Sequence, residues 1–287
     1  MRIACLQFNP VIYQVAQNME RADAILRDAA PQNLDLLMLP ELAFSGYNHP
    51  DLPSITPFLE PTGSGSSTRW AIATARRLNC HVSVGYPEIT TTTSPQRYNS
   101  VVLISPEGEI VTNYRKSFLY YTDETWATEG DAGFYAGNIE GLGDVSMGIC
   151  MDLNPYQFSA PWTKYEFSTH AVTTASTLIL LTMAWLSGDP DVAPISAAAK
   201  PHLHTLSYWL ERLNPLIEAK WHEEVFVALC NRCGSEGTSH YVGTSVVMGI
   251  QRGEVRLYGF VGQGEEKLLL VDTANQGSAT LLLPEGN

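Results

Sequence analysis

The stretch LLMLPE, from Leu36 to Glu41, joins a continuous apolar run to a proline and a carboxylate. It predicts a strand over 34–39 that is buried on both faces, because the run shows no alternation with polar residues. Pro40 ends the strand, since proline has no N–H to donate to a sheet. Glu41 is therefore expected just past the carboxyl end of a buried strand, where α/β folds place their binding crevices.

The segments on both sides of this strand alternate between strand and helix patterns. Arg2 to Phe8 predicts a strand, and the amphipathic spacing of Val15 to Ala30 predicts a helix. Further helices are predicted over 66–78 and 203–221, a surface loop over 186–201, and strands over 82–86, 99–104, 109–113, 145–149, 178–183, 225–230, 241–248, 254–259 and 267–271. This mixture predicts a layered α/β fold, and we expect residues 1–287 to form a single domain because nothing marks a boundary.

The charge balance of the chain excludes one class of partner. The 287 residues include 17 Lys and Arg against 30 Asp and Glu, which gives a formal net charge of -13. Nucleic-acid binding depends on clustered cations, so we expect no nucleic-acid partner. No apolar run approaches the roughly 20 residues of a membrane helix, and the first residues form a strand pattern without the zones of a signal peptide. These features predict a cytoplasmic protein without membrane contact.

The cysteines and histidines do not form a disulfide or metal pattern. Five cysteines are few for this length and odd in number, which argues against a disulfide framework. Cys230 and Cys233 form a C-x-x-C pair without the second pair that a structural zinc site needs. His202 and His204 are two residues apart and so do not share a helix face. We therefore expect no metal and no cofactor.

Three reactive residue types stand at predicted strand ends. Cys150 follows the strand predicted over 145–149 and precedes a turn, the position of a nucleophile elbow. Glu41 can take a thiol proton, and Lys116, after the strand predicted over 109–113, can stabilise a negative charge. Taken singly, Cys150 is more often a small buried residue and Lys116 an exposed strand-end residue, and the alternative for Glu41 is a helix amino-terminal acid or a solvated loop residue. Together they are the minimum set for acyl transfer through a thioester.

These residues lie in three sequence blocks that resemble the nitrilase, or carbon-nitrogen hydrolase, superfamily. The blocks are LPELAFSGY at 39–47, YRK at 114–116 and GICMD at 148–152. The resemblance spans residues 2–272, and within the superfamily it is greatest to fungal enzymes that deamidate amino-terminal Asn and Gln. It implies an α-β-β-α sandwich fold.

The resemblance also implies catalytic roles for residues of this chain. It makes Cys150 the nucleophile, Glu41 the general base and Lys116 the stabiliser of the oxyanion, which the backbone N–H of Met151 also binds. The implied reaction joins Cys150 to the substrate as a thioester, releases ammonia and then hydrolyses the thioester. Asp152 is expected to fix the turn after the nucleophile.

The stretch after Lys116 supplies candidates for substrate binding. Asp123 and Glu124 are both open as a second carboxylate, one to align the catalytic groups and one to bind the ammonium of a free amino terminus. Each is equally a solvated loop residue. Tyr120 and Trp185 are candidates for the pocket wall, with burial in the core as the alternative.

The implied activity is hydrolysis of the side-chain amide of amino-terminal Asn or Gln to Asp or Glu and ammonia, a step of N-degron processing in a eukaryotic cell. The alternative is a small-molecule ω-amide or carbamoyl amidase of the same superfamily. Asn154 favours the peptide substrate, because many small-amide members carry an arginine near this position. The expected partners are amino termini of proteins or peptides, and the resemblance implies frequent homodimers.

Overall fold

Within the residues that the structure describes, the strands form two sheets of seven and one short hairpin. The first sheet has the order β15-β1-β2-β4-β5-β6, with β3 beside β4; its strands are β1 (Arg2–Gln7), β2 (Leu36–Met38), β3 (Glu60–Pro61), β4 (His81–Ile89), β5 (Arg97–Ile104), β6 (Ile110–Arg115) and β15 (Lys267–Asp272). The second has the order β16-β14-β13-β10-β9-β8-β7; its strands are β7 (Tyr135–Ile139), β8 (Gly143–Ile149), β9 (Leu178–Met183), β10 (Val225–Asn231), β13 (Val246–Gln251), β14 (Glu254–Phe260) and β16 (Ala279–Leu281). The hairpin is β11 (Cys233–Glu236) with β12 (Ser239–Val242). The computed structural model describes residues 1–188 and 199–281.

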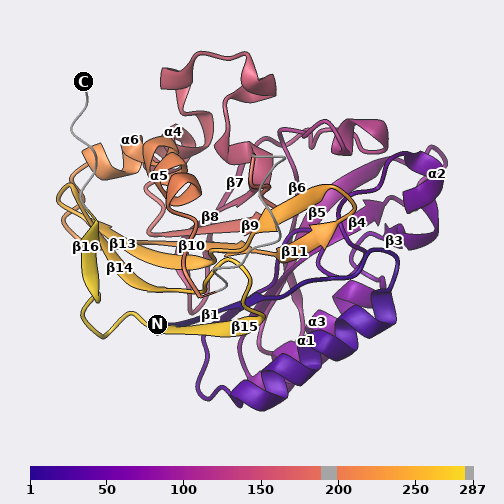
Figure 1. Ribbon diagram of the computed structural model, residues 1–287, viewed down its shortest axis with the longest axis horizontal. Helices are drawn as coiled ribbons and strands as arrows, with labels where there is room; N and C mark the ends of the chain where they lie inside the picture. Colours follow the sequence, from indigo (N-terminus) through magenta and orange to yellow (C-terminus); the bar gives the residue numbers. More distant parts are fainter. Residues whose placement is uncertain (189–198, 282–287) are drawn as a thin grey trace.

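Helices cover the outer face of each sheet (Figure 1). The α-helices are α1 (Val15–Ala29), α2 (Leu52–Ile55), α3 (Ser66–Leu78), α4 (Glu166–Thr173), α5 (Leu203–Arg212) and α6 (Asn214–Glu218). The 3-10 turns are η1 (Thr56–Phe58), η2 (Asp123–Thr125), η3 (Cys150–Leu153), η4 (Tyr156–Phe158) and η5 (Trp162–Lys164). None of the helices in the described part of the chain is long and apolar enough to cross a membrane.

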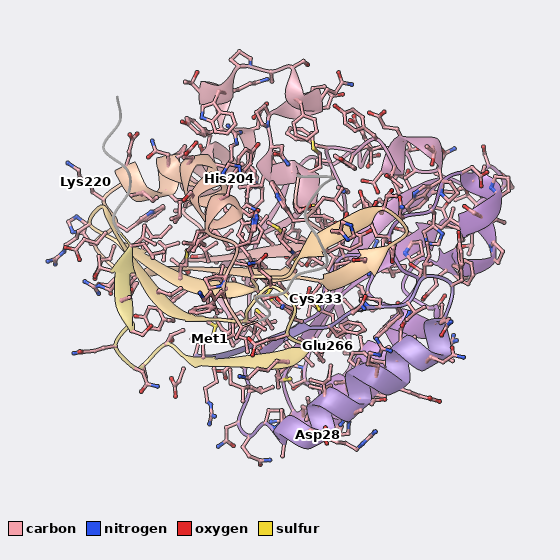
Figure 2. The ribbon with its side chains drawn as sticks, in the orientation of Figure 1. Met1, Asp28, His204, Lys220, Cys233 and Glu266 are labelled. Carbon is pink, nitrogen blue, oxygen red and sulfur yellow. The ribbon has the colours of Figure 1, made fainter. Side chains whose placement is uncertain are left out.

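The four layers follow from the alternation of side chains along each strand. In β1, Ile3 packs between the two sheets, whereas its neighbour Ala4 packs against α1 and α3. In β9, Leu178 packs between the sheets, whereas Ile179 packs against α4, α5 and α6. Both faces of these strands are therefore buried, and side chains fill the spaces between the layers (Figure 2). The predicted α-β-β-α sandwich is confirmed; that residues 1–287 form one domain stays a prediction.

Two predicted elements are each divided in the structure. The predicted helix over 203–221 is broken into α5 and α6, because Pro215 has no N–H for the helical ladder and starts a new helix. The predicted strand over 241–248 is divided between β12 and β13, because Gly243 and Thr244 have φ of 53° and 61°, which ends the extended backbone. Residues 189–198 of the predicted loop over 186–201 lie outside the described residues.

Candidate active site

Glu41 stands three residues past β2 and is fully buried. Its Oε1 accepts hydrogen bonds from Lys116 Nζ at 2.6 Å and from Asn99 Nδ2 at 2.8 Å. Its Oε2 has no hydrogen-bond partner among the described residues. Burial raises the pKa of Glu41, with the charge of Lys116 acting in the opposite direction. A carboxylate with one unpartnered oxygen and a raised pKa is suited to accept a proton.

Lys116 stands one residue past β6 and is also fully buried. Its Nζ lies 2.6 Å from Glu41 Oε1 and 2.6 Å from Asp123 Oδ2. Burial alone would lower the pKa of Lys116, but the charges of Asp123 and Glu41 hold it above its ordinary value. The ammonium therefore keeps its positive charge in the interior, where its field is weakly screened.

Cys150 is the first residue of η3, directly after β8. Its φ of 39° lies in the left-handed region, which costs a non-glycine residue about 1–3 kcal/mol and is concentrated at functional sites. Burial, and then the charge of Glu41, raise the pKa of the thiol well above its usual range, while Lys116 opposes them. A thiol with such a pKa is protonated at neutral pH and would need a base in order to act as a nucleophile.

Asp152 holds the turn that carries Cys150. Its carboxylate accepts hydrogen bonds from the backbone N–H groups of Ile149 at 2.8 Å, Ser117 at 3.1 Å and Phe118 at 2.8 Å, and from the hydroxyl of Tyr114 at 2.7 Å. One donor comes from the end of β8 and the others from the segment around Lys116. Asp152 therefore links the two segments that carry the thiol and the ammonium.

The structure distinguishes Asp123 from Glu124, the two carboxylates whose roles the sequence could not assign. Asp123 is fully buried and accepts from Lys116 Nζ, from Asn99 Nδ2 at 3.1 Å and from the Tyr120 backbone N–H at 3.1 Å. Glu124, the next residue, is exposed and does not line the pocket described below. Asp123 thus belongs to the charged cluster, and a substrate contact for Glu124 stays a prediction.

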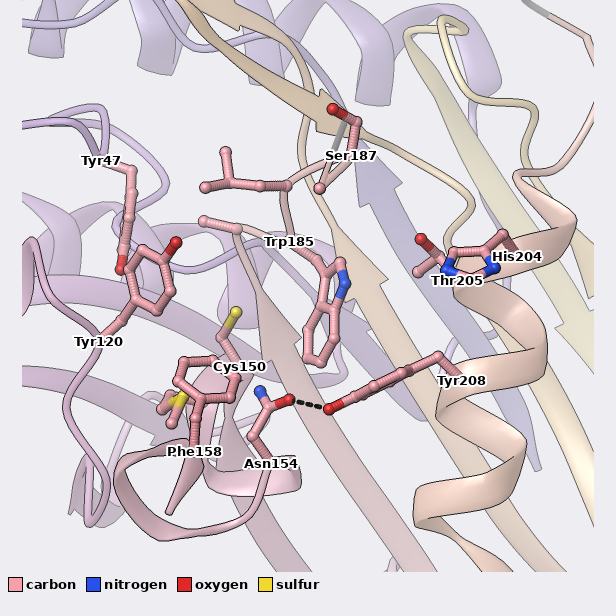
Figure 3. A pocket seen from close by; sticks show the side chains of 14 residues that line it. Tyr47, Tyr120, Cys150, Asn154, Phe158, Trp185, Ser187, His204, Thr205 and Tyr208 are labelled. Carbon is pink, nitrogen blue, oxygen red and sulfur yellow. Dashed lines mark hydrogen bonds between the residues drawn. The ribbon is translucent and has the colours of Figure 1, made fainter. Parts of the chain in front are cut away.

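A pocket of about 260 Å³ opens beside Cys150 (Figure 3). This is near the small end of the range for ligand sites, about 300–1,000 Å³, and suits a group of one residue's size. Its lining includes the predicted residues Met151, Tyr120 and Trp185, together with Tyr47, Asn154, Phe158 and Tyr208. Asn154 Oδ1 accepts a hydrogen bond of 2.6 Å from the Tyr208 hydroxyl. In the described part of the chain, the lining includes no Arg, Lys, Asp or Glu.

Several residues of this site were not predicted from the sequence. Tyr47 lies inside the LPELAFSGY block, so the block itself was the available signal. Asn99 stands in β5 just before an apolar run, and a buried polar residue in such a strand needs partners. Phe158 and Tyr208 come from a 3-10 turn and from α5, and their sequence surroundings give no comparable signal.

The arrangement offers no metal-binding cluster. Within residues 1–188 and 199–281, no group of three or more His, Cys, Asp and Glu side chains has the geometry to hold a metal ion. All five cysteines are free, and Cys233, at the start of β11, lies outside the pocket (Figure 2).

Comparison with known proteins agrees with this geometry. Residues 2–154 match the family model of carbon-nitrogen hydrolases. The chain is 35% identical to the protein N-terminal amidase of Schizosaccharomyces pombe, over 94% of this chain and 98% of that protein. It is 33% identical to the protein N-terminal amidase of Saccharomyces cerevisiae, over 65% of this chain but 45% of that longer protein.

A crystal structure of an N-terminal amidase with an Asn-Glu-Ala peptide has the same fold. Its TM-score against this structure is 0.81, at 22% sequence identity, and the match covers 94% of this chain and 96% of that one. At this level of identity the match shows the shared fold alone.

Proposed function

The chain belongs to the carbon-nitrogen hydrolase family, and on this basis we propose that it hydrolyses the side-chain amide of Asn or Gln at the amino terminus of a peptide. The products are an amino-terminal Asp or Glu and ammonia. The observation that carries the proposal is the convergence of Glu41, Lys116 and Cys150 beside a pocket of one residue's size. The S. pombe relative, which the chain matches along nearly all of both lengths, is named a protein N-terminal amidase.

The first half of the reaction forms a thioester. Glu41 Oε2, the oxygen without a partner, takes the Cys150 proton as the sulfur attacks the amide carbon. Lys116 and the backbone N–H of Met151 stabilise the oxygen as it becomes negative, and each such donor contributes about 3–4 kcal/mol. Glu41 then gives the proton to the leaving nitrogen, the C–N bond breaks and ammonia departs.

The second half returns the enzyme to its starting state. Glu41 takes a proton from water, the hydroxide adds to the thioester carbon, and the C–S bond breaks. The sulfur recovers its proton from Glu41, which leaves a carboxylic acid on the substrate. Asp123 accepts hydrogen bonds from Lys116 and Asn99 throughout, so it positions both partners of Glu41.

Recognition of the free amino terminus rests on aromatic faces and one amide. Tyr120 and Trp185 line the pocket, and aromatic faces attract an ammonium group. Asn154 Oδ1 accepts one hydrogen bond from Tyr208, and an amide oxygen has capacity for a second donor. A small ω-amide substrate with a free carboxylate would find no Arg or Lys among the described lining residues, which favours the peptide.

Ammonia release from matched peptides tests this function. Peptides that begin with Asn or Gln should release ammonia when the amino terminus is free and not when it is acetylated. Release from both would contradict the recognition of the amino terminus, and release from neither would contradict the substrate. Cys80→Ala and Cys233→Ala are matched controls that should retain activity, because both thiols are buried outside the pocket.

The wider role follows the same proposal. An acidic amino terminus made in this way is the substrate of a later transferase step in N-degron processing, and we propose that this chain carries out its step in the cytoplasm. Assembly into a homodimer stays a prediction.

A further inference from the structure

Aromatic side chains gather at the mouth of the pocket. Tyr121 is 61% exposed and Phe158 is 45% exposed, and their ring centroids lie 5.9 Å apart. Tyr120, which lines the pocket, lies 5.0 Å from Tyr121 and 6.2 Å from Phe158. We refer to Tyr120, Tyr121 and Phe158 as the rim cluster. Tyr120 and Phe158 both line the pocket (Figure 3), and Phe158 is also exposed, so the cluster is continuous with the pocket.

The backbone that carries Phe158 is strained. Gln157 and Phe158 both have φ of 52°, so two successive non-glycine residues adopt the left-handed conformation. Such residues persist only where the surrounding structure imposes them, and they cluster at functional sites. This conformation keeps a large apolar ring in partial contact with water at the pocket mouth, which folding alone does not favour.

Acidic groups lie beside the rim cluster. Glu124 is exposed, and burial followed by the charges of Glu129 and Glu124 raises the pKa of Tyr156, so both carboxylates lie near this side chain. Glu129 Oε2 accepts a hydrogen bond of 3.3 Å from the hydroxyl of Tyr156, two residues before Phe158. The surroundings of the cluster are therefore apolar and acidic, and they oppose a negatively charged ligand.

We infer that the rim cluster binds the side chain of the second residue of the substrate and favours a large apolar one. This inference rests on the proposed function: when the first side chain reaches Cys150 inside a pocket of about 260 Å³, the chain must leave through the mouth. The second residue then lies against Tyr121 and Phe158. Aromatic and aliphatic side chains gain most from such contact, glycine gains nothing, and aspartate is repelled by Glu124 and Glu129.

Kinetics with a series of peptides test the inference. Peptides of the form Asn-X, with X as Phe, Leu, Gly or Asp and the remaining sequence constant, should give kcat/KM in that order. We expect kcat/KM for the Phe peptide to exceed that for the Gly peptide by about fivefold, which is the gain that a partly exposed aromatic contact provides. The difference should lie in KM, because the contact is the same in the ground and transition states. Tyr121→Ala and Phe158→Ala should each reduce the Phe-to-Gly ratio to below about twofold.

Two controls separate the possible outcomes. Phe260→Ala removes a ring that is similarly exposed, at 40%, but lies on β14, and it should leave the ratio unchanged. Thermal melts will show that each variant is folded. Calorimetric affinities of Cys150→Ala for the same peptides measure the preference without turnover and should give the same order.

Equal affinities and equal kcat/KM for every X would overturn the rim inference, and so would a preference that survives both rim substitutions. Absence of ammonia from all peptides would overturn the proposed function. In that case an ordered preference in the Cys150→Ala affinities would still support the rim site, and its absence would reject it.

Discussion

Two buried glutamates in this molecule, Glu41 and Glu236, each pair with a buried cation, yet their pKa values are shifted in opposite directions. Glu236 Oε1 accepts from the Arg232 guanidinium, and its Oε2 accepts from the Asn48 backbone N–H at 2.7 Å and the Tyr241 hydroxyl at 2.7 Å. Burial opposes its ionised form, but the Arg232 charge and these donors hold the pKa of Glu236 below its ordinary value. Glu41, with Lys116 beside it, has a raised pKa.

The difference lies in the negative charge of Asp123, which also raises the pKa of Glu41, and in how many donors reach each carboxylate. Both oxygens of Glu236 have donors, whereas Oε2 of Glu41 has none among the described residues. Glu88 follows the Glu236 pattern: Arg115, Ser100 and other donors hold its pKa low despite burial. A buried ion pair is therefore structural when its carboxylate is saturated and is poised for proton transfer when one oxygen is free.

The largest expected effect comes from replacing Glu41, whose Oε2 has no hydrogen-bond partner among the described residues. Glu41→Gln should lower kcat by at least about 10³-fold, because the amide cannot take the thiol proton. Its free energy of unfolding should fall less than that of Glu236→Gln, because a raised pKa means that the fold disfavours the charged form of Glu41, and Lys116 keeps Asp123 as a partner. Glu236→Gln is the matched control: it should lose stability and keep most of kcat. Equal losses of stability in Glu41→Gln and Glu236→Gln would contradict the proposed difference between the two buried glutamates.

The next effect is structural. Arg232→Met leaves Glu236 buried without its cation, which should lower the free energy of unfolding by about 3–5 kcal/mol in urea titrations. Glu236 also accepts from the Tyr47 backbone N–H at 3.1 Å, so this loss should loosen one wall of the pocket and raise KM. A double variant, Arg232→Met with Glu236→Gln, should lose less than the sum of the single variants. Strict additivity would show that the two residues do not interact.

A smaller effect is expected at the turn that carries Cys150. Asp152→Asn keeps one of the two acceptor oxygens, so at least one of four donors loses its partner, at a cost of about 1–3 kcal/mol near neutral pH. Burial raises the pKa of Asp152 from 3.8 to about 6. A raised pKa means that protonated Asp152 adds stability below pH 3.8, which is lost as the pH rises through 6. Stability of the wild type should therefore fall over this window relative to Asp152→Asn. Parallel curves for the two proteins would show that Asp152 does not titrate there.

The smallest expected effect is that of replacing Glu124, and it distinguishes this residue from its neighbour Asp123 in η2. Glu124→Gln should change kcat/KM for an Asn-Gly peptide by less than about twofold, because the side chain is exposed. Asp123→Asn should lower kcat substantially, because Lys116 loses one of its two carboxylates. A larger effect from Glu124 than from Asp123 would reverse this assignment.

The sequence predicted the elements that carry the site but not its full composition. Glu41, Lys116 and Cys150 follow strands whose apolar runs are readable without a structure, and the structure brings Glu41 and Lys116 into direct contact. Asp123 and Glu124 are neighbours of the same chemistry, and burial is what separates them, which depends on packing from distant segments. Glu236 reaches Asn48 across 188 positions of the chain. A local sequence pattern cannot indicate a contact between residues that are so far apart in the chain.

The most direct test combines substrate and nucleophile in one measurement. A peptide with a free amino-terminal Asn is incubated with the wild type or with Cys150→Ala, and its mass and the released ammonia are measured together. The wild type should convert NH2 to OH on the first side chain, with one ammonia per peptide, and Cys150→Ala should give neither product. The same conversion by Cys150→Ala would contradict the assignment of Cys150 as the nucleophile.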